Sequence, residues 1–189
     1  MYTFESFHEE EIEVLKSRFI GLLWPISKKS EVVDKLKLAK EMYPKARHYC
    51  YAYKCGIDRY ASSDGEPHNT FAKPVLELFD KKDIDYCLLI VVRYFGGTLL
   101  GAGRLLRTYV DIANLTLNNA KKVELVDGYK YNLIVKYEKL ADFKNDSDIK
   151  IIDEKHHDED ASITIMCLNQ IFSSDGIKIV KEEKIKLKQ

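Results

Sequence analysis

The chain has 189 residues and balances 30 lysines and arginines against 30 acidic residues, so its formal net charge at pH 7 is zero. Together with 46% hydrophobic residues, that balance excludes an intrinsically disordered segment and a protein that coats nucleic acid indiscriminately. The acidic N-terminus and a longest apolar run of only six residues, 87–92, favour neither a secretory signal nor a membrane helix, so we expect a cytoplasmic protein without membrane contact.

Hydrophobic periodicity divides the chain into a helix-containing domain, 1–127, and a strand-rich domain, 128–189. The first domain begins with apolar and β-branched residues over 12–24, which predict a strand or a bent pair of strands. Apolar residues then recur at spacings of three and four. This spacing predicts a helix that Ser30 caps and that Pro44 ends.

The middle of the first domain changes between strand and helix patterns. Residues 47–54 alternate, which predicts a strand with its three tyrosines on one face, and the turn-rich segment 58–70 predicts an irregular loop. Pro74 suits the first turn of a short helix. The uniformly apolar run 84–92 predicts a strand buried on both faces, and a glycine loop leads from it into the longest helix, predicted over 102–120. This order places a helix N-terminus at the end of a buried strand. The apolar stripe of the helix is expected at Leu106, Val110, Ala113 and Leu117, with Leu105, Tyr109 and Ile112 beside it.

The second domain is predicted to hold four strands and one short helix. Their order is that of a ferredoxin-like fold, in which the second helix is reduced to residues 169–172. The fold class is therefore α+β, and we expect the thinly covered face of the small sheet to pack on the first domain or on a second subunit. The predicted elements are strands at 129–137, 149–152, 161–168 and 177–187 and a helix at 138–144.

The glycine loop is the strongest candidate for a binding site. Its glycines could expose backbone N–H groups, and the helix N-terminus and nearby arginines could hold a phosphate or another anion. A nucleotide is not implied, because the loop fits neither the Walker pattern nor the dinucleotide fingerprint. Tight turning and close packing of helix against strand would explain the same glycines without a ligand. The candidate residues are Arg93, Gly96, Gly97, Gly101, Gly103, Arg104 and Arg107.

Other chemical groupings are weaker. His48 and Cys50 share one face of their strand and could form a nucleophilic couple, or a zinc site with Cys55, but buried packing explains them better. Asp64 and Glu66 flank a turn glycine and could bind a metal, although turn geometry alone favours Asp and Gly. The tyrosines of the same strand could stack on bases or pack in the core. We therefore expect no catalytic residue, no metal and no cofactor.

The first domain contains four ordered motifs, Arg47-His-Tyr-Cys-Tyr-Ala-Tyr53, Ser63-Asp-Gly-Glu-Pro67, Lys73-Pro74 and Arg93-Tyr-Phe-Gly-Gly-Thr-Leu-Leu-Gly-Ala-Gly103. Together they resemble the IMPACT family, whose bacterial members are called the YigZ family, over about residues 10–127. The resemblance implies an N-terminal domain with the fold of domain IV of elongation factor G, which GHMP-type kinases share. The second domain resembles the family's C-terminal domain, which is like domain V of that factor, in strand order only. Eukaryotic members regulate translation and bind a ribosome-associated activator of an initiation-factor kinase.

The resemblance adds a second group of functional positions to those of the glycine loop. They are His48, Asp64, Gly65, Glu66, Thr70 and Pro74. The chain departs from the family at four positions: Tyr49 replaces a usual asparagine, and Asn69, Ala72 and Arg104 stand where the family has glycines. Loss of these glycines would hinder the close approach of a ligand to either loop, whereas Arg104 adds a cation at the helix start.

The residues and the resemblance together predict a non-catalytic binding protein that regulates translation. We expect it to bind RNA, a ribosome or a translation-regulatory protein through the segment 93–107 and the loop 58–70. The alternative is a small-molecule enzyme or a binder of a phosphate ligand that uses the loop 96–103. A regulator that binds only proteins is a third possibility, and oligomers could form through the sheet of the second domain.

Overall fold

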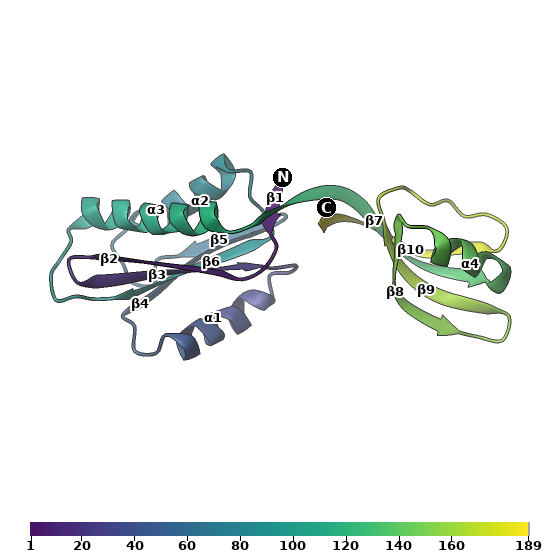
Figure 1. Ribbon diagram of the computed structural model, residues 1–189, viewed down its shortest axis with the longest axis horizontal. Helices are drawn as coiled ribbons and strands as arrows, with labels where there is room; N and C mark the ends of the chain where they lie inside the picture. Colours follow the sequence, from purple (N-terminus) through teal and green to yellow (C-terminus); the bar gives the residue numbers. More distant parts are fainter. Residues whose placement is uncertain (189) are drawn as a thin grey trace. The chain divides into compact units, whose positions relative to one another are not determined.

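A five-stranded antiparallel sheet forms the centre of the N-terminal unit, Met1–Glu124, in the computed structural model. The structure describes residues 1–188 and has an α+β fold with two units, the second of which begins at Leu125. Helix α1 covers one face of the first sheet, and helices α2 and α3 cover the other (Figure 1). In order across the sheet, the strands are β2 (His8–Val14), β3 (Ser17–Pro25), β6 (Cys87–Tyr94), β4 (His48–Cys55) and β5 (Asp58–Ser62). The helices are α1 (Glu31–Met42), α2 (Ala72–Lys81) and α3 (Ala102–Asn119).

Strand β6 is the central strand that the apolar run predicted. Its side chains alternate between two cores: Leu89 and Val91 pack in the core beneath α2 and α3, whereas Leu88 and Ile90 pack in the core against α1. Every residue of β6 except its last is buried. The prediction is therefore confirmed, although the strand begins at Cys87 and not at residue 84.

Helix α3 is also confirmed, but its buried face is centred differently. The fully buried positions include Leu105, Tyr109 and Ile112, while Leu106 and Val110, which we expected at the centre of the apolar stripe, are half-buried. Gly21 on β3 explains how closely α3 lies on the sheet, because a methyl group there would collide with the hydroxyl of Thr116.

The predicted cap of α1 is wrong. Ser30 has helical backbone angles, φ −61° and ψ −23°, and its side chain makes no capping hydrogen bond. The carboxylate of Glu31 instead accepts the backbone N–H groups of Ser27 (2.9 Å) and Lys28 (3.1 Å). The acidic side chain therefore holds the turn that precedes the helix.

The segment 58–70 is not irregular throughout. Asp58–Ser62 forms the edge strand β5, which pairs with β4 and aligns Tyr60 with Tyr53. Turn-forming residues dominate this segment, and pairing with β4 still makes it a strand. The irregular loop is confined to the residues between β5 and α2.

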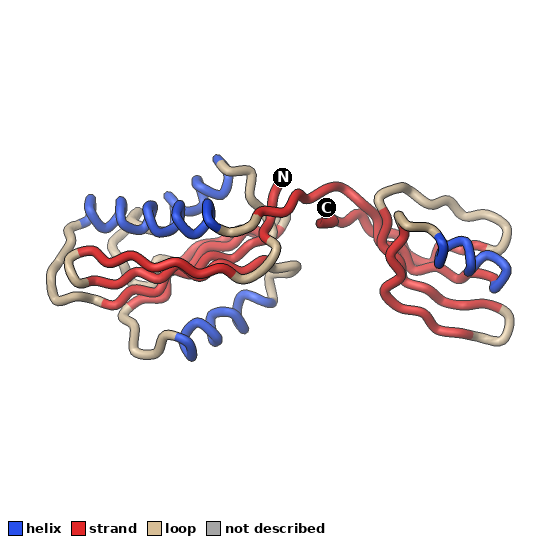
Figure 2. Tube along the Cα trace, viewed as in Figure 1, coloured by secondary structure: helices blue, strands red, loops and turns tan. Residues whose placement is uncertain are grey.

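The C-terminal unit has the strand order of a ferredoxin-like fold. Its strands lie in the antiparallel order β10-β7-β9-β8, and α4 contributes Leu140 and Phe143 to the core on one face. The predicted helical stub at 169–172 is not helical (Figure 2). No helix within residues 1–188 combines the length and the apolar character needed to cross a membrane. The elements are β7 (Lys122–Lys136), whose first residues pair with β1 (Tyr2–Phe4), α4 (Tyr137–Asn145), β8 (Ile149–His156), β9 (Asp160–Cys167) and β10 (Ile177–Lys188).

Candidate functional site

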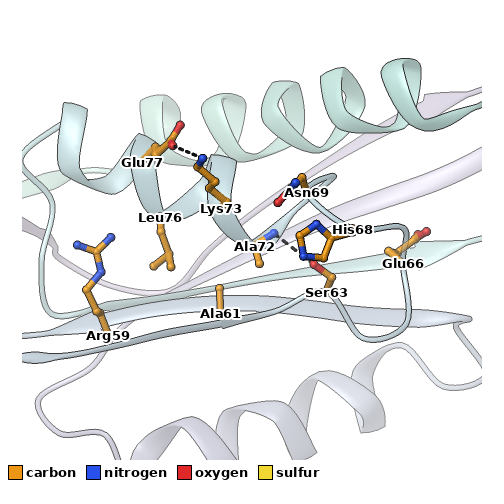
Figure 3. A pocket seen from close by; sticks show the side chains of 10 residues that line it. All are labelled: Arg59, Ala61, Ser63, Glu66, His68, Asn69, Ala72, Lys73, Leu76 and Glu77. Atoms are coloured by element: carbon orange, nitrogen blue, oxygen red, sulfur yellow. Dashed lines mark hydrogen bonds and ion pairs between the residues drawn. The ribbon is translucent and has the colours of Figure 1, made fainter.

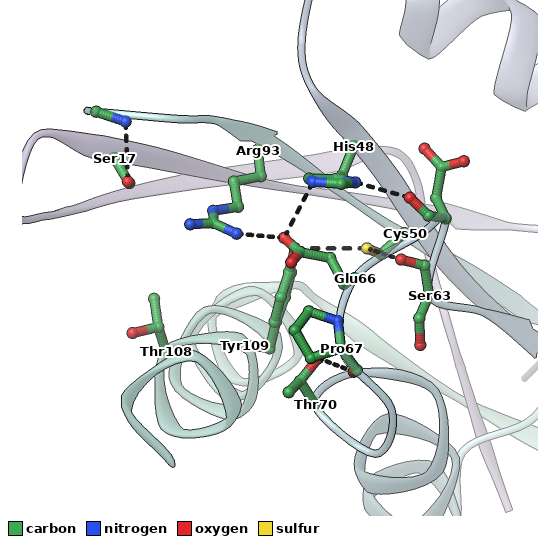
Figure 4. Close-up of polar contacts among 12 residues, drawn as sticks. Ser17, His48, Cys50, Ser63, Glu66, Pro67, Thr70, Arg93, Thr108 and Tyr109 are labelled. Carbon is green, nitrogen blue, oxygen red and sulfur yellow. Dashed lines mark hydrogen bonds and ion pairs between the residues drawn. The ribbon is translucent and has the colours of Figure 1, made fainter. Parts of the chain in front are cut away.

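The candidate site lies where β4 begins and β6 ends. His48 and Arg93 are register partners on these neighbouring strands. Strand alternation places both on the face that α2 and α3 cover, because Cys50 and Val91, two residues away on each strand, pack in that core. The loop after β5 brings Glu66 over the same point, as Figure 4 shows.

Glu66 is the centre of a buried polar network. Its Oε1 atom accepts hydrogen bonds from Arg93 Nη1 (2.5 Å) and from the Tyr109 hydroxyl (2.6 Å), and His48 Nε2 lies 3.8 Å away. The side chains of Glu66 and Arg93 are only 3% and 6% exposed, so this ion pair is scarcely screened by water. Burial raises the pKa of the Tyr109 hydroxyl far above its ordinary value, which keeps the hydroxyl protonated and able to donate.

The turn that carries Glu66 is held by its neighbour Asp64. Asp64 and Gly65 both have left-handed backbone angles, φ 44° and 80°. The Asp64 carbonyl accepts a hydrogen bond from His48 Nδ1 (2.7 Å), and its carboxylate accepts one from the backbone N–H of Tyr49 (2.7 Å). Asp64 therefore shapes the turn and orients the imidazole, and it does not join Glu66 as a metal-binding pair.

A cavity of about 400 Å³ joins the two predicted loops. Five of the residues that the sequence singled out line it, and Arg47 and Phe95 complete the polar and aromatic part of its wall. Most of the remaining wall is apolar and comes from the start of α3 and the residues before it. The predicted residues that converge here are His48, Gly65, Glu66, Arg93 and Gly101.

The glycines of the loop have different roles. A methyl group at Gly96 would collide with the backbone of the turn between β2 and β3, so this glycine permits close packing. Gly97 and Gly101 have φ values of 86° and 74°, which suit glycine, and no atom lies within 4 Å of the methyl position at either. At Gly103, the atom nearest to the position of an added methyl group lies 3.9 Å away. Packing therefore explains Gly96, while the other three leave open space above the backbone.

The three predicted arginines also differ. Arg93 is 5% exposed and paired with Glu66, so it does not offer the free surface guanidinium that the sequence led us to expect. Arg104 and Arg107 are exposed on the first two turns of α3, whose first turn contains no acidic residue. Arg107 Nε donates a hydrogen bond to the carbonyl of Gly103 (3.2 Å).

Thr70 and Pro74 are two of the predicted residues that do not line this cavity. Thr70 is buried, and its hydroxyl donates a hydrogen bond to the carbonyl of Pro67 (2.7 Å), which closes the loop before α2. Pro74 occupies the first turn of α2, as predicted, and lines a separate cavity with Arg107. Both residues support the loop and do not contribute to the cavity itself.

Sequence reasoning did not single out Tyr109 or Arg47 as parts of the site, and it included Phe95 only within the family motif 93–103. Tyr109 was expected only as an apolar residue of α3, yet its hydroxyl is buried among charged groups. A buried tyrosine hydroxyl requires a hydrogen-bond partner, so a tyrosine on the buried face of the helix could have indicated a polar group nearby. Arg47 lies over the ring of Phe95, with 5.8 Å between the guanidinium carbon and the ring centroid.

The surroundings of Cys50 disfavour a nucleophilic thiolate. Its thiol donates a hydrogen bond to the carbonyl of Ser63 (3.1 Å), and burial raises its pKa to about 12. We expect iodoacetamide at about pH 8 to leave Cys50 unmodified in the folded protein and to modify all four cysteines in urea, as peptide mass spectrometry would show. Equal rates of Cys50 modification in the two conditions would contradict this structure of the site.

A larger cavity of about 640 Å³ lies between the edge strand β5 and α2 (Figure 3). Of the candidate site residues, Glu66 alone lines it, beside Asn69 and Ala72, which stand where the family has glycines. Three of its charged side chains are already paired: Lys73 lies 3.9 Å from Glu77, which also lines the cavity, and Arg59 pairs with Asp80, which does not. The smaller cavity, where both predicted loops meet, is therefore the stronger site.

Comparison with known proteins agrees with the motifs. The family described as the Impact N-terminal domain matches residues 15–117, which include both loops of the site. The chain is 36% identical over 126 residues to the IMPACT family member YvyE of Bacillus subtilis. This match covers 65% of this chain and 58% of the relative. The chain is also 32% identical over 137 residues to the IMPACT family member YigZ of Escherichia coli. That match covers 68% of this chain and 66% of the relative.

A solved structure of a hypothetical protein is similar to this chain, with a TM-score of 0.70 and 26% sequence identity over 88% of this chain and 84% of that one. The matches with the two curated relatives span less than two thirds of the relatives' own lengths. The family profile nevertheless covers more than half of this chain and contains the whole candidate site. The chain belongs to the IMPACT family.

Proposed function

We propose that the protein is a non-catalytic regulator of translation that binds RNA, free or within a ribosome, through its N-terminal unit. One observation carries this proposal. Of the six arginines in the chain, three are paired with carboxylates, and the other three have no carboxylate partner within residues 1–188. The unpaired three, Arg47, Arg104 and Arg107, lie on the cavity wall and on the first two turns of α3.

The unpaired arginines and the glycine loop suit a phosphate backbone. Guanidinium groups bind phosphate oxygens in a bidentate manner, and the first N–H groups of α3 have no partner inside the helix. Open space above Gly97, Gly101 and Gly103 would allow phosphates to approach the backbone closely. Zero net charge then restricts binding to this local surface and prevents it over the whole protein.

Removal of Arg104 and Arg107 together is expected to weaken RNA binding and its dependence on salt. We expect the slope of log affinity against log salt concentration for Arg104→Ala with Arg107→Ala to fall by about 2, one for each lost phosphate contact. Fluorescence anisotropy with a labelled single-stranded RNA would measure both quantities. Lys37→Ala, which removes an exposed cation from α1 on the opposite face of the sheet, is the matched control and should change neither. Binding that is absent in the wild type, or that salt does not weaken, would refute the proposal.

A further inference from the structure

We propose that the cavity of about 400 Å³ holds one unstacked nucleobase of the bound RNA, with the polar edge of the base against Glu66 and Arg93. This inference rests on the proposed function and specifies its ligand. The surface arginines would hold the phosphates, and the cavity would hold the base. The strand would then be recognised by two different chemical groups on one face of the protein.

Glu66 and Arg93, which we call the floor of the cavity, have hydrogen-bonding groups that the protein does not use. Both hydrogen bonds to the Glu66 carboxylate end on Oε1, and Oε2 has no partner within residues 1–188. Arg93 donates to Glu66 through Nη1, while its buried Nε has no partner and its Nη2 makes no hydrogen bond to the described chain. Nε is closed to solvent, so Oε2 and Nη2 are the atoms for which a ligand in the cavity could supply partners.

The charges of the floor favour a neutral polar ligand. The charges of Glu66 and Arg93 cancel one another, so the floor has no net charge that would attract a phosphate or a metal ion. A free carboxylate oxygen beside a free guanidinium N–H offers one acceptor and one donor. Guanine, cytosine and adenine present an amino donor beside a ring or carbonyl acceptor, whereas the N–H of uracil lies between two carbonyls that repel a carboxylate. The floor therefore matches an amino-bearing base better than uracil.

The cavity walls suit the flat faces of a base. Leu99 and Phe95, which line the cavity, are 85% and 40% exposed, and Pro67, Leu100 and Leu105 supply further apolar surface. Such walls around a few convergent polar groups are typical of sites for planar ligands. Arg47 and Gly101 line the same cavity, so a base inside it would bring its own phosphate close to the arginines and to the N-terminus of α3.

Single-stranded RNAs of about ten nucleotides test this inference, because a site for unstacked RNA usually spans a length of that order. The strands are oligouridines whose central position is guanosine, uridine or an abasic unit. We expect the guanosine strand to bind about tenfold more tightly than the abasic strand, and the uridine strand to resemble the abasic one. Leu99→Ala should remove most of this preference without affecting the abasic strand. Val33→Ala, at an exposed apolar position of α1, should leave the preference intact.

The outcomes separate this inference from the proposed function. Equal affinity for the three strands, with normal weakening by salt, would refute the base pocket and leave phosphate binding in place. Absence of binding by every strand would refute both. Guanosine monophosphate that binds as tightly as the guanosine strand would show that the cavity serves a free nucleotide, and would refute an RNA strand as its ligand.

Discussion

Arg93→Ala is expected to lower the free energy of unfolding by about 3–5 kcal/mol. The change would leave the Glu66 carboxylate buried with a tyrosine hydroxyl and without its counter-charge, because both side chains of the pair are almost completely shielded from water. Urea unfolding at neutral pH, followed by circular dichroism, would measure the loss.

An exposed arginine pair gives the matched control. Arg18 donates to Glu11 through two nitrogens, at 2.7 and 2.9 Å, but its side chain is 45% exposed. Arg18→Ala should therefore cost no more than about 1 kcal/mol, because water screens an exposed pair. Adding Glu66→Gln to Arg93→Ala removes the uncompensated charge and should restore part of the stability. Equal losses for Arg93→Ala and Arg18→Ala would contradict a buried ion pair at the cavity floor.

The stability of this ion pair limits how the site can be probed. Arg93 lies in one of the motifs that resemble the family, and a partly unfolded Arg93 variant would lose binding for a reason unrelated to ligand contact. Arg104 and Arg107 carry no comparable structural bond, so their removal reports on the ligand itself. The same sequence motif thus contains a residue that supports the fold and residues that are free to bind.

Much of the fold could be predicted because local patterns agree with the tertiary environment. The uniformly apolar run became the central strand β6, and the helix after the glycine loop became α3. The predictions failed where a long-range contact decided the structure. Residues 58–62 belong to the segment 58–70, which is rich in turn formers, and pairing with β4 makes these five residues a strand.

The site was predicted in its parts and not in its geometry. Both loops could be identified from their residues, but no local pattern indicates that Glu66 meets Arg93, 27 residues further along the chain, or Tyr109, 43 residues further along. These contacts depend on the register that aligns β4 with β6 and on the face that α3 buries. Sequence spacing alone cannot give that register.

Three of the four departures from the family pattern have local explanations. Asn69, which replaces a family glycine, has a left-handed φ of 60°, and asparagine is among the few residues that tolerate this conformation. Ala72 and Arg104 lie in the first turns of α2 and α3, and neither has a positive φ. The three substitutions therefore fit the backbone at both loops.

Gly96→Ala is expected to destabilise the protein by about 3 kcal/mol, at the upper end of overpacking effects. The new methyl group would overlap the carbonyl of Lys16 and the amide nitrogen of Ser17, and backbone atoms cannot move aside as the end of a flexible side chain can. The loop is also tied at this point, because the Gly96 N–H donates to the Ser17 hydroxyl (3.0 Å). Thermal and urea unfolding would measure the loss.

Gly103→Ala separates the packing explanation of the glycines from the binding one. Its methyl group enters open space on a helix, so the free energy of unfolding should stay constant or rise by up to about 1 kcal/mol. If phosphates approach the backbone at the start of α3, the same methyl group will obstruct them, and RNA binding will weaken in a protein that is no less stable. Unchanged RNA binding would place the phosphates elsewhere and leave Gly103 without a role in recognition. If the phosphates lie at the start of α3, Gly103→Ala would instead lower the affinity for RNA without lowering stability, whereas Gly96→Ala would lower stability. This difference would assign a binding role to Gly103 and a packing role to Gly96.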